Sequence, residues 1–352
     1  MQNEPGYSPR PLRERSREEG EITSCDIFCN VIDNYGDIGV CWRLARQLAH
    51  EHGLAVRLWV DDLNSLAKLC HEADAAQDIQ HCRGVEVRHW AEPFPPLPQP
   101  LSHGCERGVA DLVIEAFGCA LPESYIEAMA AQQRSVWINL EYLSAEDWVH
   151  GCHGLPSPHP GLPLTKYFFF PGFTRQTGGL LLERDLFMRR DAFQSDAAQQ
   201  QVFWQSLGME MPSAETLKIS LFGYENDALA GLFDVWASSA QPVLCLVPEG
   251  RILPQAGQYF GDAAPRAGSS YARGSLQVRV LPFVEQERYD ELLWACDVNF
   301  VRGEDSCVRA QWAVRPFIWQ IYPQHDAVHW QKLQAFLNLY NAPLGTAASQ
   351  AV

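Results

Sequence analysis

Residues 25–39 read CDIFCNVIDNYGDIG, and this stretch decides the fold class. Its first part, residues 25–32, is a short apolar run, which predicts a buried β-strand. Residues 33–39 are rich in Asp, Asn and Gly and predict a loop. Apolar side chains then recur at helical spacing from Val40 up to Gly53, which predicts a helix that ends at this glycine. Strand, loop and helix in this order form the first unit of an α/β fold.

The same alternation continues through the rest of the chain. Strand-like runs lie at 55–60, 85–90, 111–117, 135–140, 217–222, 243–247, 276–281, 297–301 and 316–322. Most of them are separated by stretches long enough for a helix. Alternating strands and helices predict parallel, doubly wound sheets. The sequence therefore predicts two Rossmann-like α/β domains that face each other across a cleft.

Composition divides the chain into four parts. Residues 1–22 are polar and lack the apolar core of a signal peptide, so we expect a disordered leader. A Pro- and Gly-rich stretch at 151–163 predicts no regular structure, and residues 180–190 are interpreted as a connector. The expected parts are the leader at 1–22, an N-terminal domain at 23–182, a C-terminal domain at 183–325, and a final helix and tail at 326–352.

Charge and cysteine content exclude several classes of partner. The 352 residues include 27 Lys and Arg against 43 Asp and Glu, for a formal net charge of −16. This charge argues against nucleic acid and against an anionic membrane surface, and no apolar run approaches the ~20 residues of a membrane span. Eleven cysteines without metal-ligand spacing predict buried, reduced thiols and hence a cytoplasmic location.

The loop after the first predicted strand carries two carboxylates, Asp33 and Asp37, four residues apart and next to Gly36. Ligands of α/β sheets collect at such strand ends. A plain turn is the alternative, in which Asp33 caps the loop and Gly36 supplies a positive φ. With two carboxylates at one strand end, a functional site and a plain turn are about equally favoured.

A second loop, at residues 302–306, favours an anionic ligand. Asp305 or Ser306 is predicted to cap a helix whose exposed N–H groups attract anions. Arg302 adds a cationic fork that is suited to phosphate. An ordinary capped helix with a surface pair between Arg302 and Glu304 is the alternative. The chain has no GxGxxG or GxxxxGK[ST] motif, which disfavours a dinucleotide or a P-loop ATPase.

Three aromatic residues, Phe222, Tyr224 and Phe283, lie where strands of the second half end, with Gln286 just beyond. Buried core is the usual role of any one of them. Beside a phosphate-binding helix end, together they could sandwich a nucleobase while Gln286 reads its edge. The residues alone thus predict a nucleotide-diphosphate ligand in the C-terminal domain, the pattern of two-domain GT-B nucleotide-sugar transferases.

Four segments resemble one enzyme family. They are DIFCNVIDNYGDIG at 26–39, INLEYLSAE at 138–146, KYFFFPGF at 166–173 and FVRGEDS at 300–306. They are similar to motifs of the bacterial elongation factor P arginine rhamnosyltransferases (EarP), and the match runs from about residue 25 to 340. The resemblance implies a GT-B enzyme that moves L-rhamnose from dTDP-β-L-rhamnose to one arginine of elongation factor P. It also implies inversion at the anomeric carbon, with no catalytic metal and no further cofactor.

The resemblance implies roles for individual residues as well. Asp37 corresponds to the family's proposed catalytic base, Asp33 to a carboxylate that helps to hold the acceptor guanidinium, and Glu304 to another essential acid. The expected nucleotide-sugar-binding residues are Phe222, Tyr224, Phe283, Gln286, Arg302, Asp305, Ser306 and Gly36. Whether Glu304 binds the sugar ring or orders its loop stays open.

Two other functions stay open at this point. Another GT-B enzyme, with a different nucleotide sugar and a small-molecule or lipid acceptor, would keep the nucleotide site but gives no reason for two carboxylates on the acceptor side. A nucleotide-sugar-binding sensor without turnover would bind dTDP and would tolerate the loss of Asp33 or Asp37. Transfer to elongation factor P distinguishes a rhamnosyltransferase from both.

Overall fold

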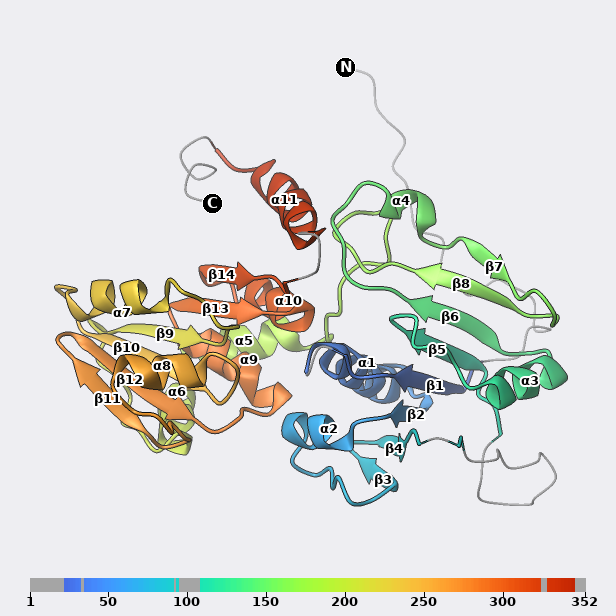
Figure 1. Cartoon of the computed structure of the whole chain (residues 1–352), viewed down its shortest axis with the longest axis horizontal. Helices are drawn as coiled ribbons and strands as arrows, with labels where there is room; N and C mark the ends of the chain where they lie inside the picture. The colour runs from blue at the N-terminus through green and yellow to red at the C-terminus, as the bar shows by residue number, and fades with distance from the viewer. Residues whose placement is uncertain (1–21, 33–34, 92, 95–107, 324–327, 346–352) are drawn as a thin grey trace.

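The chain forms two sheets with helices packed around them, as Figure 1 shows. A computed structural model describes residues 22–32, 35–91, 93–94, 108–323 and 328–345. Nearly all of the expected leader, and Asp33 of the first predicted loop, lie outside these ranges. Within them, both sheets are dominated by parallel pairing, and the predicted α/β fold with two Rossmann-like domains is confirmed.

The N-terminal sheet has eight strands in the order β3-β4-β2-β1-β5-β6-β8-β7. Its inner strands are parallel, whereas β3 and β7 at the edges pair antiparallel with their neighbours. The strands are β1 Ser24–Cys29, β2 Ala55–Val60, β3 Ile79–Cys82, β4 Val85–His89, β5 Leu112–Ala116, β6 Val136–Leu140, β7 Pro156–Pro158 and β8 Thr165–Phe169. The helices of this half are α1 Gly36–His52, α2 Leu63–Leu69, α3 Glu123–Gln132 and α4 Val149–Cys152.

The C-terminal sheet has six strands in the order β11-β12-β10-β9-β13-β14, and only the edge strand β11 is antiparallel. The strands are β9 Leu217–Leu221, β10 Val243–Pro248, β11 Ser270–Arg273, β12 Leu276–Leu281, β13 Val298–Arg302 and β14 Phe317–Gln320. The helices are α5 Leu186–Ser195, α6 Ala197–Ser206, α7 Leu229–Ala237, α8 Leu253–Tyr259, α9 Gln286–Ala295, α10 Glu304–Trp312 and α11 Val328–Asn341.

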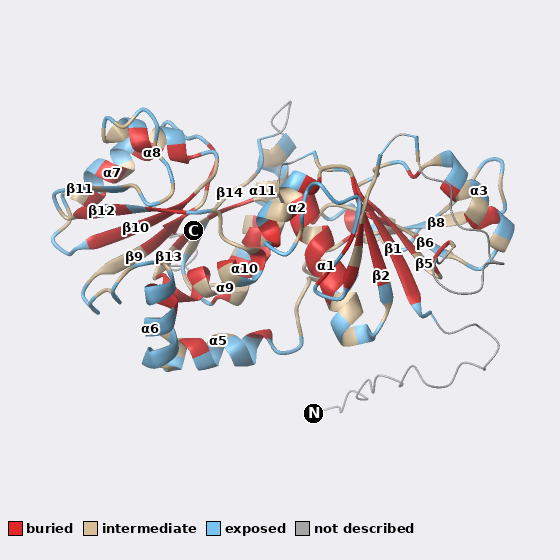
Figure 2. Ribbon diagram, turned by 90° about the horizontal axis from the view of Figure 1, so that it is seen from below, coloured by how far each residue is buried: buried red, intermediate tan, exposed pale blue. Residues whose placement is uncertain are grey.

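The central strands are buried because side chains pack on both of their faces (Figure 2). On one face of β1, Ile27 packs in a cluster with Trp42 of α1. On the other face, Phe28 packs with Trp59 and with Tyr125 of α3. This packing fixes β1 between two layers, so α1, which follows it directly, starts at a defined place beside the sheet.

Helix α11 packs against both halves of the molecule. Its Phe336 ring lies 5.3 Å from Phe173, in the segment after β8, and 5.3 Å from Trp319 of β14. The final amphipathic helix expected from the sequence is therefore present and closes one side of the domain junction. No helix in the described part of the chain is both long and apolar enough to cross a membrane.

The structure corrects several local predictions. Helix α1 begins at Gly36, so Gly36 and Asp37 lie in its first turn, and the alternative in which Gly36 takes a positive φ is wrong. The Pro-rich stretch contains the last two residues of α4 and all of β7, although no regular structure was expected. Proline is tolerated in β7 because this strand lies at the sheet edge. The presumed connector contains the start of α5.

Candidate active site at the domain junction

A pocket opens where the two domains meet, and both contribute to its walls. Tyr35, Gly36 and Gly39 come from the start of α1, and the other side comes mainly from the C-terminal domain. We call this the Arg302 pocket; its lining includes all the donor-site residues expected from the sequence, namely Gly36, Phe222, Tyr224, Phe283, Gln286, Arg302, Asp305 and Ser306.

Arg302 stands at the end of β13 against two aromatic rings. Its guanidinium carbon lies 4.4 Å from the ring centroid of Phe222 and 4.8 Å from that of Tyr224. The ring of Phe283 meets Phe222 at 79°, with centroids 6.3 Å apart. The rings of Phe222 and Phe283 therefore form a corner, and the expected sandwich of a nucleobase between the aromatic residues stays a prediction. Such a corner offers a base one stacking face and one ring edge.

The first turn of α10 forms the anionic-ligand side of the pocket. Gly303 is the N-cap, with φ 65°, and the helix begins at Glu304, so the expected cap at Asp305 or Ser306 is wrong. Only glycine adopts this φ without strain, which places the cap two residues before Asp305. The first N–H groups of a helix have no intrahelical partner. The hydroxyl oxygen of Ser306 is also buried without a hydrogen-bond partner in the described structure. The first N–H groups of α10 and this hydroxyl are therefore suited to bind a phosphate.

Gln286 and Asp305 line the pocket, but their side chains bind the opposite domain. The Gln286 amide donates to the carbonyl of Gly39 (2.6 Å) and accepts from Arg46 (2.6 Å). The Asp305 carboxylate accepts from Arg43 at 2.7 and 3.0 Å. In this conformation these two side chains join the domains, and direct contact between either of them and a nucleotide stays a prediction.

A second pocket adjoins the first and contains Asp37. We call it the Asp37 pocket; it shares Gly36, Gly303 and Glu304 with the Arg302 pocket, and its remaining lining includes Asp37, Phe117, Tyr142, Trp319, Lys332 and Phe336. Asp37 lies in the first turn of α1 with 2% of its surface exposed. One of its carboxylate oxygens accepts the N–H of Ile32 at 2.9 Å. Asp37 is thereby held in place at the wall of this pocket.

The Asp37 pocket combines acidic groups with aromatic faces. Phe117 and Tyr142 stack with centroids 4.4 Å apart and planes 18° apart. The Lys332 ammonium of α11 lies 5.7 Å from the Tyr142 centroid, so this ring already faces a cation. Sequence reasoning gave these aromatic residues no role, although Tyr142 stands inside the quoted INLEYLSAE segment.

Glu304 links the two pockets and the two domains. One of its carboxylate oxygens accepts the N–H of Leu143, in the loop after β6, at 2.8 Å. Leu143 belongs to the N-terminal domain, and Glu304 is the first residue of α10. This bond therefore orders the loop after β6 and the loop between β13 and α10 at the junction. Of the two roles left open for Glu304, the structure thus supports loop ordering.

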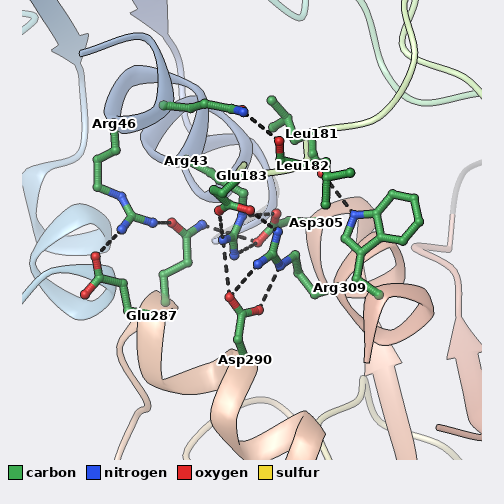
Figure 3. A network of polar contacts seen from close by, with 12 residues as sticks. Arg43, Arg46, Leu181, Leu182, Glu183, Glu287, Asp290, Asp305 and Arg309 are labelled. Atoms are coloured by element: carbon green, nitrogen blue, oxygen red, sulfur yellow. Dashed lines mark hydrogen bonds and ion pairs between the residues drawn. The ribbon is translucent and has the colours of Figure 1, made fainter. Parts of the chain in front are cut away.

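Behind the pockets, a cluster of charged side chains joins α1, the interdomain segment and helices α9 and α10 (Figure 3). Glu183 accepts from Arg43 (2.9 Å) with one oxygen and from Arg309 (2.6 Å) with the other. Asp290 forms a bidentate pair with Arg309 at 2.8 and 2.6 Å. The sequence analysis missed this cluster. Arg43 lies on the face of α1 opposite the apolar stripe, where an arginine is ordinary in a sequence, so no local pattern pointed to the cluster.

The two arginines strongly perturb Glu183. Burial would raise its pKa, but Arg43 and Arg309 outweigh burial and lower the pKa from 4.5 to about 2. Because the folded pKa lies below the unfolded value, the stabilisation is complete above about pH 4.5 and is lost as the pH falls towards 2. A shift of this size corresponds to about 3 kcal/mol.

Glu183→Gln should therefore make the free energy of unfolding depend less steeply on pH in the acidic range. We expect the wild type to lose free energy of unfolding more steeply than the variant between about pH 4.5 and 3. Urea titrations at a series of pH values measure the difference. Glu215→Gln, at an exposed position, is the control. Parallel acid limbs for wild type and Glu183→Gln would contradict the role of the arginines.

The fold and the paired pockets define a class of protein, the two-domain glycosyltransferases with the GT-B fold. Comparison with known proteins narrows this class. Residues 25–352 match the family of elongation factor P (EF-P) rhamnosyltransferases, EarP. The chain is 54% identical to a protein-arginine rhamnosyltransferase of Pseudomonas putida over 93% of this chain and 84% of that one. It is 52% identical to a protein-arginine rhamnosyltransferase of Pseudomonas aeruginosa over 92% and 83% of the two chains.

A solved structure agrees with the sequence comparisons. It was described for the structural basis of EarP-mediated arginine glycosylation of translation elongation factor EF-P. It superposes with a TM-score of 0.62 at 39% identity and covers 94% of this chain and 81% of its own. The chain belongs to the EarP family of EF-P rhamnosyltransferases.

Proposed function

We propose that this protein transfers L-rhamnose from dTDP-β-L-rhamnose to one arginine of elongation factor P, with inversion at the anomeric carbon. The observation that carries the proposal is the meeting of two unlike pockets at Glu304. The Arg302 pocket combines a guanidinium, aromatic rings and a helix N-terminus, which suit a nucleotide diphosphate. The Asp37 pocket combines carboxylates and aromatic faces, which suit a guanidinium. The activity of the relatives supports this choice of substrates.

The acceptor poses a specific chemical problem. A guanidinium has a pKa above about 12 and a delocalised lone pair, so it is a weak nucleophile. A carboxylate that accepts its N–H bonds can fix its plane and take a proton as the new bond forms. Asp37 is assigned this role, because α1 and the N–H of Ile32 hold it at the pocket wall. Asp33, four residues earlier, is expected to share in holding the guanidinium.

The reaction is a single displacement. The guanidinium nitrogen bonds to C1 of rhamnose while the bond from C1 to the diphosphate oxygen breaks, and the nitrogen's proton passes to Asp37. The electron pair leaves with dTDP. Arg302 and the first turn of α10 stabilise the developing charge of this leaving group. Since these groups supply the positive charge, the proposed reaction uses no catalytic metal. It is expected to take place in the cytoplasm, with its protein acceptor.

Intact-mass spectrometry of elongation factor P tests the proposal. After incubation with the enzyme and dTDP-β-L-rhamnose, we expect a mass gain of one deoxyhexose, localised by fragmentation to one arginine. The one-bond NMR coupling between C1 and its proton in the attached sugar reports the configuration at the anomeric carbon. dTDP-glucose and UDP-glucose, incubated in parallel, should give far less transfer.

The outcomes separate the remaining candidates. Transfer from another nucleotide sugar, or to another acceptor, would indicate a GT-B enzyme of different specificity. Binding of dTDP without any transfer would favour a sensor. Retention of configuration would contradict the single displacement but leave the substrates unchanged.

A further inference from the structure

We propose that Arg43 is a positioning residue that fixes the donor site against the catalytic carboxylate across the domain junction. The proposal deepens the function proposed above and rests on it. Arg43 lies in α1 of the N-terminal domain and is 1% exposed. Its guanidinium reaches across the junction to the first turn of α10.

The contact with Asp305 is bidentate, and both carboxylate oxygens take part. Nε of Arg43 donates to Oδ1 at 2.7 Å, and Nη2 donates to Oδ2 at 3.0 Å. Two parallel bonds fix the relative orientation of the two groups as well as their distance. Asp305 stands between Glu304 and Ser306 in the first turn of α10, so the pair orients this whole turn. The nucleotide is expected to meet that same turn.

Helix α1 links the Arg43–Asp305 pair to the proposed catalytic base, Asp37. Asp37 lies in the first turn of α1, and Arg43 follows six residues later in the same helix, a rise of about 9 Å. A rigid helix with Asp37 at its start and Arg43 further along therefore sets the place of Asp37 relative to α10. Gly39 lies between Asp37 and Arg43 in α1, and its carbonyl accepts from the Gln286 amide. This bond is a second contact across the junction.

The same guanidinium also binds the segment between the domains. Nη1 of Arg43 donates to Glu183, which in turn accepts from Arg309 of α10. Neighbouring carbonyls of this segment, Leu181 and Leu182, accept from Trp312 of α10 and Gln47 of α1 (Figure 3). Arg43 thus joins the donor-site helix and the interdomain segment at once, at the place where a change in domain angle would act.

Burial of so many charges is not explained by stability alone. A buried ion pair often contributes no more than well-packed apolar residues would, because desolvation offsets its attraction. What bidentate pairs add is defined geometry. The pKa values agree with tight pairing: burial would lower that of Arg43, but Asp305, Asp290 and Glu183 raise it above its ordinary range.

The chain offers a matched control for a purely structural arginine. Arg57 of β2 is also fully buried, and it pairs with Asp26 through two guanidinium nitrogens, with Tyr125 bonded to the same carboxylate. This group lies within the N-terminal domain and lines neither of the two pockets. Loss of either arginine should reduce stability, but only loss of Arg43 should disturb the geometry between the domains.

The experiment compares Arg43→Met, Arg43→Lys and Arg57→Met at a temperature where circular dichroism shows each to be folded. Transfer to elongation factor P gives kcat and the KM values, and calorimetry gives the Kd of dTDP. We expect both Arg43 variants to lose about 10- to 100-fold in kcat, because an error of about 1 Å costs this much. dTDP should bind several-fold more weakly. Lysine keeps the charge but lacks the planar fork, so Arg43→Lys should not restore kcat.

Arg57→Met should lower the melting temperature and leave kcat and the Kd of dTDP close to those of the wild type. Equal kcat losses in Arg57→Met and the Arg43 variants would overturn the proposal, as would full activity in Arg43→Lys. Should Arg43→Met fail to fold, Arg43→Lys carries the test. An inactive wild type would instead count against the proposed function, and the dTDP affinities would then still decide whether Arg43 positions the donor site.

Discussion

Replacing Asp37 by asparagine should lower kcat by about 10²- to 10⁴-fold, the usual contribution of a general base. Asparagine has nearly the same shape, and its amide oxygen can still accept the N–H of Ile32, which Asp37 holds at 2.9 Å. The substitution therefore removes the ability to take a proton, together with the negative charge that faces the guanidinium, and keeps the contact with Ile32. Because Asp37 lines the second pocket and not the Arg302 pocket, the Kd of dTDP should change little. Steady-state transfer kinetics and calorimetry measure the two quantities.

Asp61→Asn is the matched control for this experiment. Asp61 accepts the N–H of Val31 at 2.9 Å, so both carboxylates hold adjacent residues of the same segment. Asp61 does not line the Asp37 pocket. If the defect of Asp37→Asn came from a loosened segment, Asp61→Asn would share it. An Asp61→Asn enzyme with normal kcat beside an inactive Asp37→Asn enzyme would assign the loss to the Asp37 carboxylate itself and not to the segment that it holds.

The order of strands and helices was predictable because its signals are local. β2 and β12 fall at the positions that their apolar runs predict, and Gly53 ends α1 in the left-handed conformation, as its place after the helical pattern indicates. The edge strands β3, β7 and β11 were missed. Edge strands are short and half exposed, so the hydrophobic pattern on which such predictions depend is weak there.

The start of α1 shows how tertiary context overrides local propensity. Asp33, Asn34 and Gly36 are turn formers, and they predicted a loop up to Gly39, yet the helix begins at Gly36. The docked helix gains the contact between Gly39 and Gln286, which no local pattern contains. This shift moves Asp37 from a loop into a helix, and so gives it a more rigid setting than expected.

The interdomain contacts could not be predicted from local patterns at all. The residues that the motifs assign to the donor site all line the Arg302 pocket, but no motif predicted an interdomain contact of Gln286 or Asp305. In the structure, the partners of these side chains are Arg46 and Arg43, about 240 and 262 positions away in the sequence. Side-chain pairing at such separation depends on the relative placement of two domains, which a single sequence does not encode in any spacing rule.

Arg302→Met should raise the Kd of dTDP by about 10- to 100-fold, the usual cost of losing charge-assisted hydrogen bonds. Methionine can still pack against Phe222 and Tyr224, which now flank the guanidinium, so the aromatic corner should persist. kcat should fall as well, because the leaving diphosphate loses its cation. Arg302→Lys should recover part of both losses, since it restores the charge but not the fork. Calorimetry with dTDP and with thymidine separates the phosphate contribution, because thymidine affinity should change little.

Arg251→Met is the control that isolates position from charge. Arg251 also lies over Tyr224, at 5.8 Å, but it is half exposed, pairs with Glu225 and does not line the Arg302 pocket. Both substitutions make a chain of net charge −16 more acidic by the same amount. If long-range attraction governed donor binding, the two variants would weaken it equally and salt would reduce the difference from wild type. A large effect confined to Arg302→Met would mean that one fixed guanidinium, placed at the end of β13, lets a strongly acidic protein bind a diphosphate.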